Sequence, residues 1–336
     1  MILACDVGGT KTNVALLEHA DGTWHMRRRA SYPSREHASL HEIISAFLAE
    51  HPSRLDAACF GVAGPVSGDR VDTTNLPWTV DANRLARTTG LRRVSLVNDV
   101  ELQAWSLLAL GAGDQVTLQT GPRGAGNFAV IAAGTGLGMS ALVRGDGVIR
   151  SLASEGGHAD FASNDETDLA LVRHLRQRFA HVSAERVVSG RGLWNVYEFF
   201  RDRDRADEPA WLAGAVADGD PAAAVAHAAM DGNSGLAQRA VLYFLGAYGA
   251  EAGNWALRTM ATGGVWLGGG VAHKLLVGPP GTSDSWRERA RDAFLARFRA
   301  KGRLSALLET VAVHVITCEE APLLGAAHFA HSAIGR

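Results

Sequence analysis

The chain has 336 residues, of which 47% are hydrophobic and 20% charged, and a formal net charge of −2 at pH 7. This length allows two domains with ample cores, and the composition is that of an ordinary soluble globular protein. The near-neutral charge excludes a chain-wide attraction to nucleic acid or to an anionic membrane, so we expect neither as a partner.

The three cysteines, Cys5, Cys59 and Cys318, lie far apart in the chain. No two of them form a C-x-x-C pair, so the spacing argues against a disulfide scaffold and a zinc ribbon and fits a reducing compartment. The sequence starts in a strand-like run without a secretory signal, and no apolar run is long enough to span a bilayer. We therefore expect a cytoplasmic protein.

The first motif is ILACDVGGTKTNVALL, near the start of the chain. Its Gly-Thr-Lys-Thr segment is similar to the end of a nucleotide-binding P-loop, but Thr10 precedes Lys11 where that loop requires glycine. The residues that follow favour a strand rather than a helix. The motif therefore predicts a β-hairpin with Gly8 and Gly9 at its tip.

A second motif, FAVIAAGTGLGMSALV at residues 128–143, repeats this design. Its apolar runs are separated by Gly134, Thr135 and Gly136. A dinucleotide-binding fingerprint would need a third glycine where Met139 stands and a helix after the turn, and neither condition is met.

Two glycine-tipped hairpins in two halves of one chain predict an internal duplication, with each half contributing a hairpin to a cleft between domains. Backbone N–H groups at glycine turns form concave nests for anions, and the missing side chains let phosphate oxygens approach closely. Thr10 and Thr135 would add hydroxyl donors. The alternative is that both are merely tight turns.

The intervening segments alternate between strand and helix patterns, which predicts α/β layers. We expect a helix over 40–48, a strand within 55–66, a strand at 94–98 that breaks at Asn98-Asp99 and continues as a helix containing 102–110, and a strand, turn and helix over 263–276. A further helix is expected over 163–179, with Ser163 and Glu166 at capping-box spacing and Leu169 on its apolar face. Residues 201–221 are expected to be an exposed surface excursion.

Three polar groups stand out. Asn98 and Asp99 lie where a buried strand gives way to a helix, a position at which α/β sheets bind ligands, although Asp99 could simply cap that helix. Glu155 and His158 flank a Gly-Gly turn, which favours a small polar ligand over a helical metal site. Glu185 follows in a separate segment, where it could simply stabilise a helix N-terminus.

Six motifs appear in the order found in one known family: DVGGTKTN near the start, VND at 97–99, AGTGLG at 133–138, SEGGH at 154–158, HVSAERVVSG at 181–190 and LGGGV at 267–271. The chain closely resembles bacterial glucokinases of the hexokinase and actin-like ATPase superfamily over nearly its whole length. It lacks the cysteine-rich zinc motif of the related ROK sugar kinases and the helix-turn-helix of ROK repressors.

The resemblance implies a fold of duplicated ribonuclease-H-like domains with ATP and sugar in an interdomain cleft. It implies a smaller domain of residues 1–110 plus about 319–336, and a larger one of residues 111–318. It further implies ATP-dependent phosphorylation of glucose, with ATP and Mg²⁺ bound and a homodimer as the oligomeric state.

The family's functional residues fall on matching positions. The resemblance implies that Asp99 is the catalytic base, and that the sugar is bound by Asn98, Glu155, His158 and Glu185. The implied nucleotide-binding residues are Asp6, Gly8, Gly9, Thr10, Gly134, Thr135, Gly136, Gly268, Gly269 and Gly270, with Asp6 reaching Mg²⁺ through water. Val100 and Glu101 depart from the family pattern, which leaves the sugar preference open. Kinases of another hexose, a non-catalytic sugar sensor and a chaperone-like or filament-forming ATPase are the alternatives.

Overall fold

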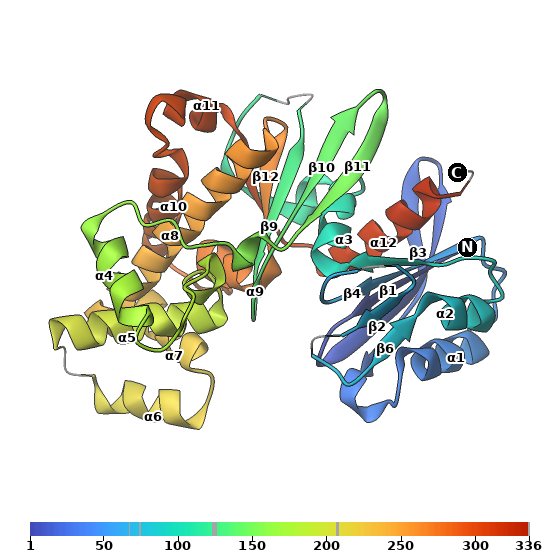
Figure 1. The fold of residues 1–336 in the computed structure, drawn as a ribbon, viewed down its shortest axis with the longest axis horizontal. Helices are drawn as coiled ribbons and strands as arrows, with labels where there is room; N and C mark the ends of the chain where they lie inside the picture. Colours follow the sequence, from blue (N-terminus) through green and yellow to red (C-terminus); the bar gives the residue numbers. More distant parts are fainter. Residues whose placement is uncertain (67, 74, 123–125, 206–207, 335–336) are drawn as a thin grey trace. The chain divides into compact units, whose positions relative to one another are not determined.

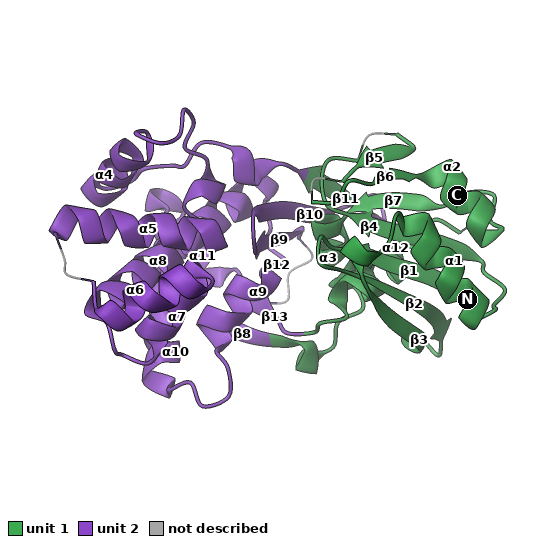
Figure 2. Ribbon diagram, turned by 90° about the horizontal axis from the view of Figure 1, so that it is seen from below, with its two compact units in different colours: residues 1–115, 151–153, 318–336 green, residues 116–150, 154–317 purple. Residues whose placement is uncertain are grey.

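The computed structural model describes residues 1–334 apart from 67, 74, 123–125 and 206–207. The chain divides into two compact units, which Figure 2 shows in different colours. Unit 1 contains residues 1–115, 151–153 and 318–336, and unit 2 contains residues 116–150 and 154–317.

Unit 1 is built on a mixed sheet flanked by helices. Its strands are β1 (Ile2–Val7), β2 (Lys11–Ala20), β3 (Thr23–Pro33), β4 (Ala57–Val62), β5 (Arg70–Asp72), β6 (Thr79–Asp81) and β7 (Ser95–Asn98), and its helices are η1 (Ser34–Glu36), α1 (Leu40–Glu50), α2 (Ala82–Thr89), α3 (Asp99–Ser106) and α12 (Ala321–Ser332). The main sheet has the order β3-β2-β1-β4-β7. β1 pairs antiparallel with β2, whereas β1, β4 and β7 run parallel.

Both faces of this sheet are covered because β1 is apolar on both sides. Leu3 and Cys5 belong to a hydrophobic cluster that includes Ile43 and Phe47 of α1, whereas Ile2 and Ala4 join a second cluster with residues of α12. This division follows the period of two along a strand, which sends successive side chains to opposite faces. Figure 1 shows the red helix α12 beside the blue strands formed by the start of the chain.

Unit 2 repeats the plan with more helices. Its strands are β8 (Gln115–Gln119), β9 (Phe128–Ala133), β10 (Leu137–Gly145), β11 (Val148–Ser154), β12 (Gly264–Gly268) and β13 (Val313–Ile316), and its helices include η3 (Gly156–His158), α4 (Glu166–Leu175), η4 (Ala184–Arg186), α5 (Gly190–Asp204), α6 (Ala210–Asp218), α7 (Pro221–Met230), α8 (Gly235–Thr259), α9 (Gly269–Ala272), the π-helical η5 (His273–Val277), α10 (Asp284–Arg299) and α11 (Ser305–Thr310). The sheet order is β11-β10-β9-β12-β13-β8.

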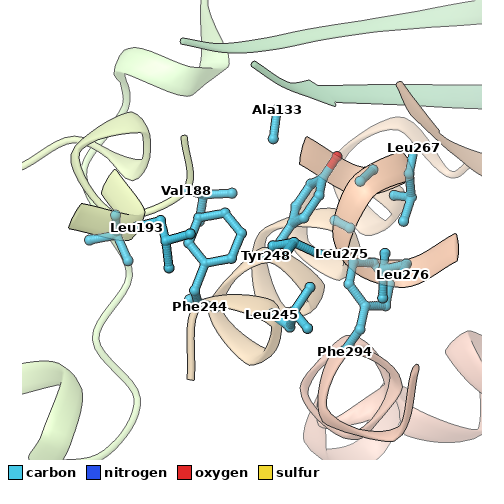
Figure 3. Packing of buried hydrophobic residues seen from close by; sticks show 14 of the residues in the cluster. Ala133, Val188, Leu193, Phe244, Leu245, Tyr248, Leu267, Leu275, Leu276 and Phe294 are labelled. Carbon is cyan, nitrogen blue, oxygen red and sulfur yellow. The ribbon is translucent and has the colours of Figure 1, made fainter. Parts of the chain in front are cut away.

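The two sheets confirm the predicted duplication. In each, a glycine-tipped antiparallel hairpin (β1–β2 and β9–β10) is followed by parallel pairing of the hairpin's first strand with a later one. The expected helix over 40–48 and the expected strand, turn and helix over 263–276 are confirmed as well. Figure 3 shows how α8 fills the core of unit 2 with Phe244, Leu245 and Tyr248, which pack near Phe294 of α10.

Three local predictions were wrong. The helix after Asn98 begins at Asp99 but ends at Ser106, so it stops short of the expected residue 110. Helix α4 is capped by Asp165, whose side chain accepts the N–H of Asp168 at 2.8 Å, and not by Ser163. Leu169 is 40% exposed, because the buried positions of α4 are Asp168, Leu171 and Leu175.

Residues 201–221 are not simply a surface excursion. The segment contains the end of α5 and the whole of α6, and Leu212 of α6 is fully buried. Its low hydrophobic periodicity hid a helix that packs on the core of unit 2 through Leu212 and the partly buried Val216. In the part of the chain that the structure describes, no helix is long and apolar enough to cross a membrane.

A buried ion pair ties three helices of unit 2 together. Asp168 of α4 is fully buried and accepts hydrogen bonds from both terminal nitrogens of Arg297 on α10, at 3.1 and 2.5 Å. The hydroxyl of Tyr243 on α8 donates to the same carboxylate at 2.5 Å, and the N–H of Asn164 donates at 2.8 Å. Burial, followed by the neighbouring Asp168 carboxylate, raises the pKa of Tyr243. The carboxylate is therefore well satisfied without solvent.

We predict that Asp168→Ala destabilises unit 2 by about 3–5 kcal/mol, because it leaves the half-buried guanidinium of Arg297 without its partner. Chemical denaturation followed by circular dichroism would measure the change. Asp284→Ala is the control, since it removes a fully exposed carboxylate paired with Arg287 and should cost less than about 1 kcal/mol. Equal losses in the two variants would contradict the prediction.

Candidate functional site

The tip of the β1–β2 hairpin is held by Ser34 of η1. The hydroxyl of Ser34 donates to the carbonyl of Gly8 at 2.7 Å, and its N–H donates to the carbonyl of Thr10 at 2.9 Å. A Cβ atom at Gly9 would lie 2.8 Å from the Cβ of Asn75, so this position has no room for a side chain. Ser34 therefore holds the loop in place through the carbonyl groups of Gly8 and Thr10.

Asp6 lies on β1 just before this loop, opposite Asn13 of β2. Burial raises the pKa of Asp6, against the opposing effects of a hydrogen bond from Asn13 and the charge of Lys11. Among the described residues, the buried Oδ1 atom of Asn13 has no hydrogen-bond partner. A carboxylate and an amide oxygen, both poorly solvated, are therefore present beside the hairpin tip.

Asn98 and Asp99 lie at the same edge of the unit 1 sheet as this loop. Val7, Val62 and Asn98 are aligned across the parallel strands β1, β4 and β7, so the ends of β1 and β7 lie about 10 Å apart. Parallel pairing thus brings the hairpin tip and the Asn98–Asp99 pair to one edge.

The cap of α3 is Asn98 rather than Asp99. Its Oδ1 atom accepts the N–H groups of Val100 and Glu101 at 3.0 and 3.3 Å, and its Nδ2 atom donates to the carbonyl of Gly64 at 3.2 Å. Asp99 occupies the first position of the helix, where the helix dipole favours an ionised carboxylate. The capping alternative considered for Asp99 is therefore wrong.

In unit 2, the tip of the β9–β10 hairpin is held by the segment 185–190. The N–H of Gly190 donates to the carbonyl of Gly134 at 2.8 Å, and Oε2 of Glu185 accepts the N–H of Leu137 at 3.0 Å. A Cβ atom at Gly136 would lie 2.6 Å from that same Oε2 atom. Glu185 therefore packs directly on the glycine loop.

The turn between β12 and α9 lies beside the same hairpin, since β12 pairs in parallel with β9 and Gly268 is opposite Ala132. Gly269 has a φ of +78°, and a Cβ atom there would lie 2.3 Å from the carbonyl oxygen of Ala133. Only glycine fits such a position. At Gly270, by contrast, an added Cβ would meet nothing within 4 Å.

The turn η3 presents the exposed side chains of Glu155 and His158, whose Oε2 and Nε2 atoms are 4.0 Å apart. It packs tightly on the β9–β10 hairpin, since a Cβ atom at Gly157 would lie 1.9 Å from the carbonyl oxygen of Leu137. His158 and Glu185 line one small hollow of about 350 Å³, together with Arg178 and Arg186. No group of three or more acidic, histidine or cysteine residues suited to a metal ion occurs in the described ranges.

A larger cavity of about 550 Å³ lies within unit 2. Gly134, Thr135 and Gly270 form part of its wall, so the hairpin tip and the β12–α9 turn open onto the same space. The remaining lining is mostly apolar and includes Leu193, Pro221, Ala222, Ala226, Val271 and Leu275. Its charged side chains are the basic Arg191 and Lys274 and the acidic Asp220. A mostly apolar cavity of this size with a few polar groups suits a small organic ligand.

Each unit thus assembles its own predicted residues. Unit 1 brings together the loop of residues 8–10, Asp6, Asn98 and Asp99, and unit 2 brings together the remaining candidates. Sequence reasoning missed Ser34, Arg191 and Lys274. Lys274 lies one helical turn after the LGGGV motif, which was the available signal for it, whereas the contact of Ser34 with the hairpin depends on tertiary packing.

Duplicated sheets with glycine loops at their parallel strand ends define the actin-like ATPase fold of sugar kinases. Solved structures agree: the chain superposes on a glucokinase from an Antarctic psychrotroph with a TM-score of 0.85 and 28% identity, covering 99% of both chains. It also matches the fold of a glucokinase from Balamuthia mandrillaris in complex with glucose, with a TM-score of 0.76, 20% identity and coverage of 98% and 93%.

The chain belongs to the glucokinase family, whose model matches residues 3–333. It is 37% identical to a glucokinase of Nostoc sp., over 97% of this chain and 98% of the relative. It is 34% identical to a glucokinase of Photorhabdus laumondii, over 96% and 94% of the two chains. The resemblance found in the sequence motifs is therefore confirmed.

We predict that Gly269→Ala and Gly270→Ala differ in stability although they are neighbours. Gly269→Ala should lower the unfolding free energy by about 1–3 kcal/mol, because the added Cβ would clash with backbone and the residue would keep a positive φ. Gly270→Ala should leave stability within about 0.5 kcal/mol of the parent or raise it, since it replaces a helical glycine in open space. Thermal unfolding of both variants checks this, and a larger loss for Gly270→Ala would refute it.

Proposed function

We propose that this protein catalyses ATP-dependent phosphorylation of glucose at the 6-hydroxyl, giving glucose 6-phosphate and ADP. Membership of the glucokinase family supports the reaction. The observation that carries the proposal is the alignment of Val7, Val62 and Asn98, which places a carboxylate and a glycine loop at one sheet edge. In the family's motif these are the base and the first phosphate loop.

Asp99 is proposed as the general base. The sugar hydroxyl oxygen attacks the γ-phosphorus, its proton passes to the Asp99 carboxylate, and the bond from the γ-phosphorus to the bridging oxygen breaks to release ADP. A carboxylate in this role typically contributes about 10²–10⁴ in rate. The helix dipole of α3 favours the ionised form that can accept the proton.

The nucleotide is proposed to lie along the cavity of unit 2, with its phosphates at Gly134, Thr135 and Gly136 and its adenosine against Gly268, Gly269 and Gly270. The cavity supports this, since the hairpin tip and Gly270 line the same space. The apolar residues of the lining suit a purine ring, and Lys274 and Arg191 add positive charge for an anionic ligand. Gly8, Gly9 and Thr10 are proposed to bind phosphate oxygens from unit 1.

Asp6 and Asn13 fit a magnesium ion. Mg²⁺ prefers oxygen ligands, keeps several waters and uses one or two carboxylates together with substrate phosphates. The buried carboxylate of Asp6, whose pKa burial raises, and the unpaired Oδ1 of Asn13 would suit a cation beside the loop. Bound there, Mg²⁺ would neutralise phosphate charge, and Asp6 would hold it through water.

The sugar is proposed to bind Asn98 of unit 1 and Glu155, His158 and Glu185 of unit 2. Carboxylates offer paired acceptors to hydroxyl groups, and the amide and imidazole can also donate. The Nδ2 atom of Asn98 has two N–H groups, of which the bond to Gly64 uses one. A site that hydrogen-bonds a given hydroxyl discriminates strongly against analogues that lack it.

Further features of the protein are proposed on the family resemblance. We propose that the protein catalyses the first step of glycolysis, lies in the cytoplasm and forms a homodimer. The same applies to the domain limits, with residues 1–110 and about 319–336 in a smaller domain and residues 111–318 in a larger one.

Asp99→Asn should retain glucose binding and lower kcat by about 10²–10⁴, because the amide has the shape of the carboxylate without its basicity. The measurement is ADP release with Mg-ATP and a panel of hexoses, together with glucose binding by calorimetry. Asp284→Asn, at the first position of α10, is the control and should be fully active. Near-normal kcat in Asp99→Asn would remove it from the role of base.

Glu155→Gln should raise the KM for glucose about tenfold or more and leave the KM for ATP within about twofold, because one charged acceptor for the sugar is lost. Steady-state kinetics with each substrate varied in turn tests this. The exposed Glu288→Gln on α10 should change neither constant. A parallel rise in both constants would show that Glu155 does not act on the sugar alone.

A further inference from the structure

Glu101 is a partly buried carboxylate that the proposed reaction does not use. It lies in the first turn of α3, two residues after Asp99, and the hydroxyl of Ser151 donates a hydrogen bond to its Oε1 atom. Burial raises the pKa of Glu101, and the Ser151 hydrogen bond opposes that rise. Taking a carboxylate out of water is costly unless it is well partnered, so its presence needs an explanation.

The backbone of Glu101 is fixed on two sides. Its N–H is capped by Oδ1 of Asn98, and α3 packs closely on α12, where a Cβ atom at Gly325 would lie 1.8 Å from the carbonyl oxygen of Leu102. The carboxylate therefore projects from a rigid point. Whatever it binds is held at a set position relative to the first turn of α3.

Its partner, Ser151, lies in β11, a strand that belongs to both units. Residues 151–153 belong to unit 1, whereas residues 148–150 and 154 belong to unit 2. The strand runs directly into the turn that carries Glu155 and His158, and the hydroxyl of Ser154 accepts the N–H of Gly156 at 2.9 Å. Chain continuity thus joins Ser151 to Glu155 within four residues.

We propose that Glu101 is a positioning residue for the phosphorylation reaction: by holding Ser151, it fixes residues 151–153 of unit 1, the strand segment that leads directly into the turn carrying Glu155 and His158. This inference rests on the proposed function. It assigns a role in sugar alignment to a residue that departs from the family's motif beside the base. Glu101 itself touches neither the sugar nor the phosphates in this role.

The test is a double-mutant cycle of Glu101→Ala and Ser151→Ala, with kinetics for both substrates and glucose binding by calorimetry. Each single variant should lower kcat/KM for glucose about tenfold and leave the KM for ATP unchanged, which is the size expected for loss of one hydrogen bond to a charged group. The double variant should be no worse than either single one, because both remove the same contact. Glu101→Gln keeps an acceptor oxygen and should recover most of the loss.

Thr88→Ala is the matched control, since it removes a hydroxyl contact to His41 elsewhere in unit 1 and should leave all constants unchanged. Circular dichroism would verify folding, and Ser151→Ala alone suffices if Glu101→Ala fails to fold. Unchanged glucose kinetics in Ser151→Ala, additive losses, or an equal rise in both KM values would each overturn the inference. A parent protein without sugar-dependent ADP release would instead refute the proposed function.

Discussion

Parallel pairing of β1 with β4, and of β4 with β7, is the constraint on which the candidate site of unit 1 depends. Parallel strands end at the same edge, so the register that aligns Val7, Val62 and Asn98 also brings a glycine loop and a helix N-terminus side by side. The polar residues themselves contribute little to this arrangement. It is stabilised by the apolar side chains of these strands, which pack into hydrophobic clusters on the two faces of the sheet. The geometry of the candidate site is thus set largely by core packing.

Unit 2 applies the same constraint to a different set of groups. Its β9 and β12 end together, which places the hairpin tip beside the positive-φ turn at Gly269 and opens both onto one cavity. Segment 185–190 then closes over the hairpin through Glu185 and Gly190. A residue proposed to bind sugar is thus bonded to a loop proposed to bind phosphate. Occupancy of one site by its ligand should therefore restrict motion in the other.

Much of this arrangement was readable from the sequence, because the two hairpins have a strong signature of apolar runs broken by glycine. The duplication followed from the match between them, and the order of six motifs identified the family. Signals that depend on single residues were less reliable. Ser163 had the spacing of a capping box, but Asp165 caps α4, since several polar residues in a row compete for that position. Helix α6 was missed because few of its side chains, among them Leu212 and Val216, pack on the core. The contacts of Ser34 and Ser151 join segments far apart in sequence, and no local pattern encodes them.

The return of the chain to unit 1 has a consequence for synthesis. Helix α12, residues 321–332, packs against β1, β4 and α3, and its Leu323, Ala326 and Ala327 complete one of the two hydrophobic clusters that cover the sheet. Chains are made from the N-terminus, so β1 is synthesised first. The helix that completes the cover of its second face, α12, is synthesised only after residue 320. Until then, that apolar face is open to chaperones or to other nascent chains.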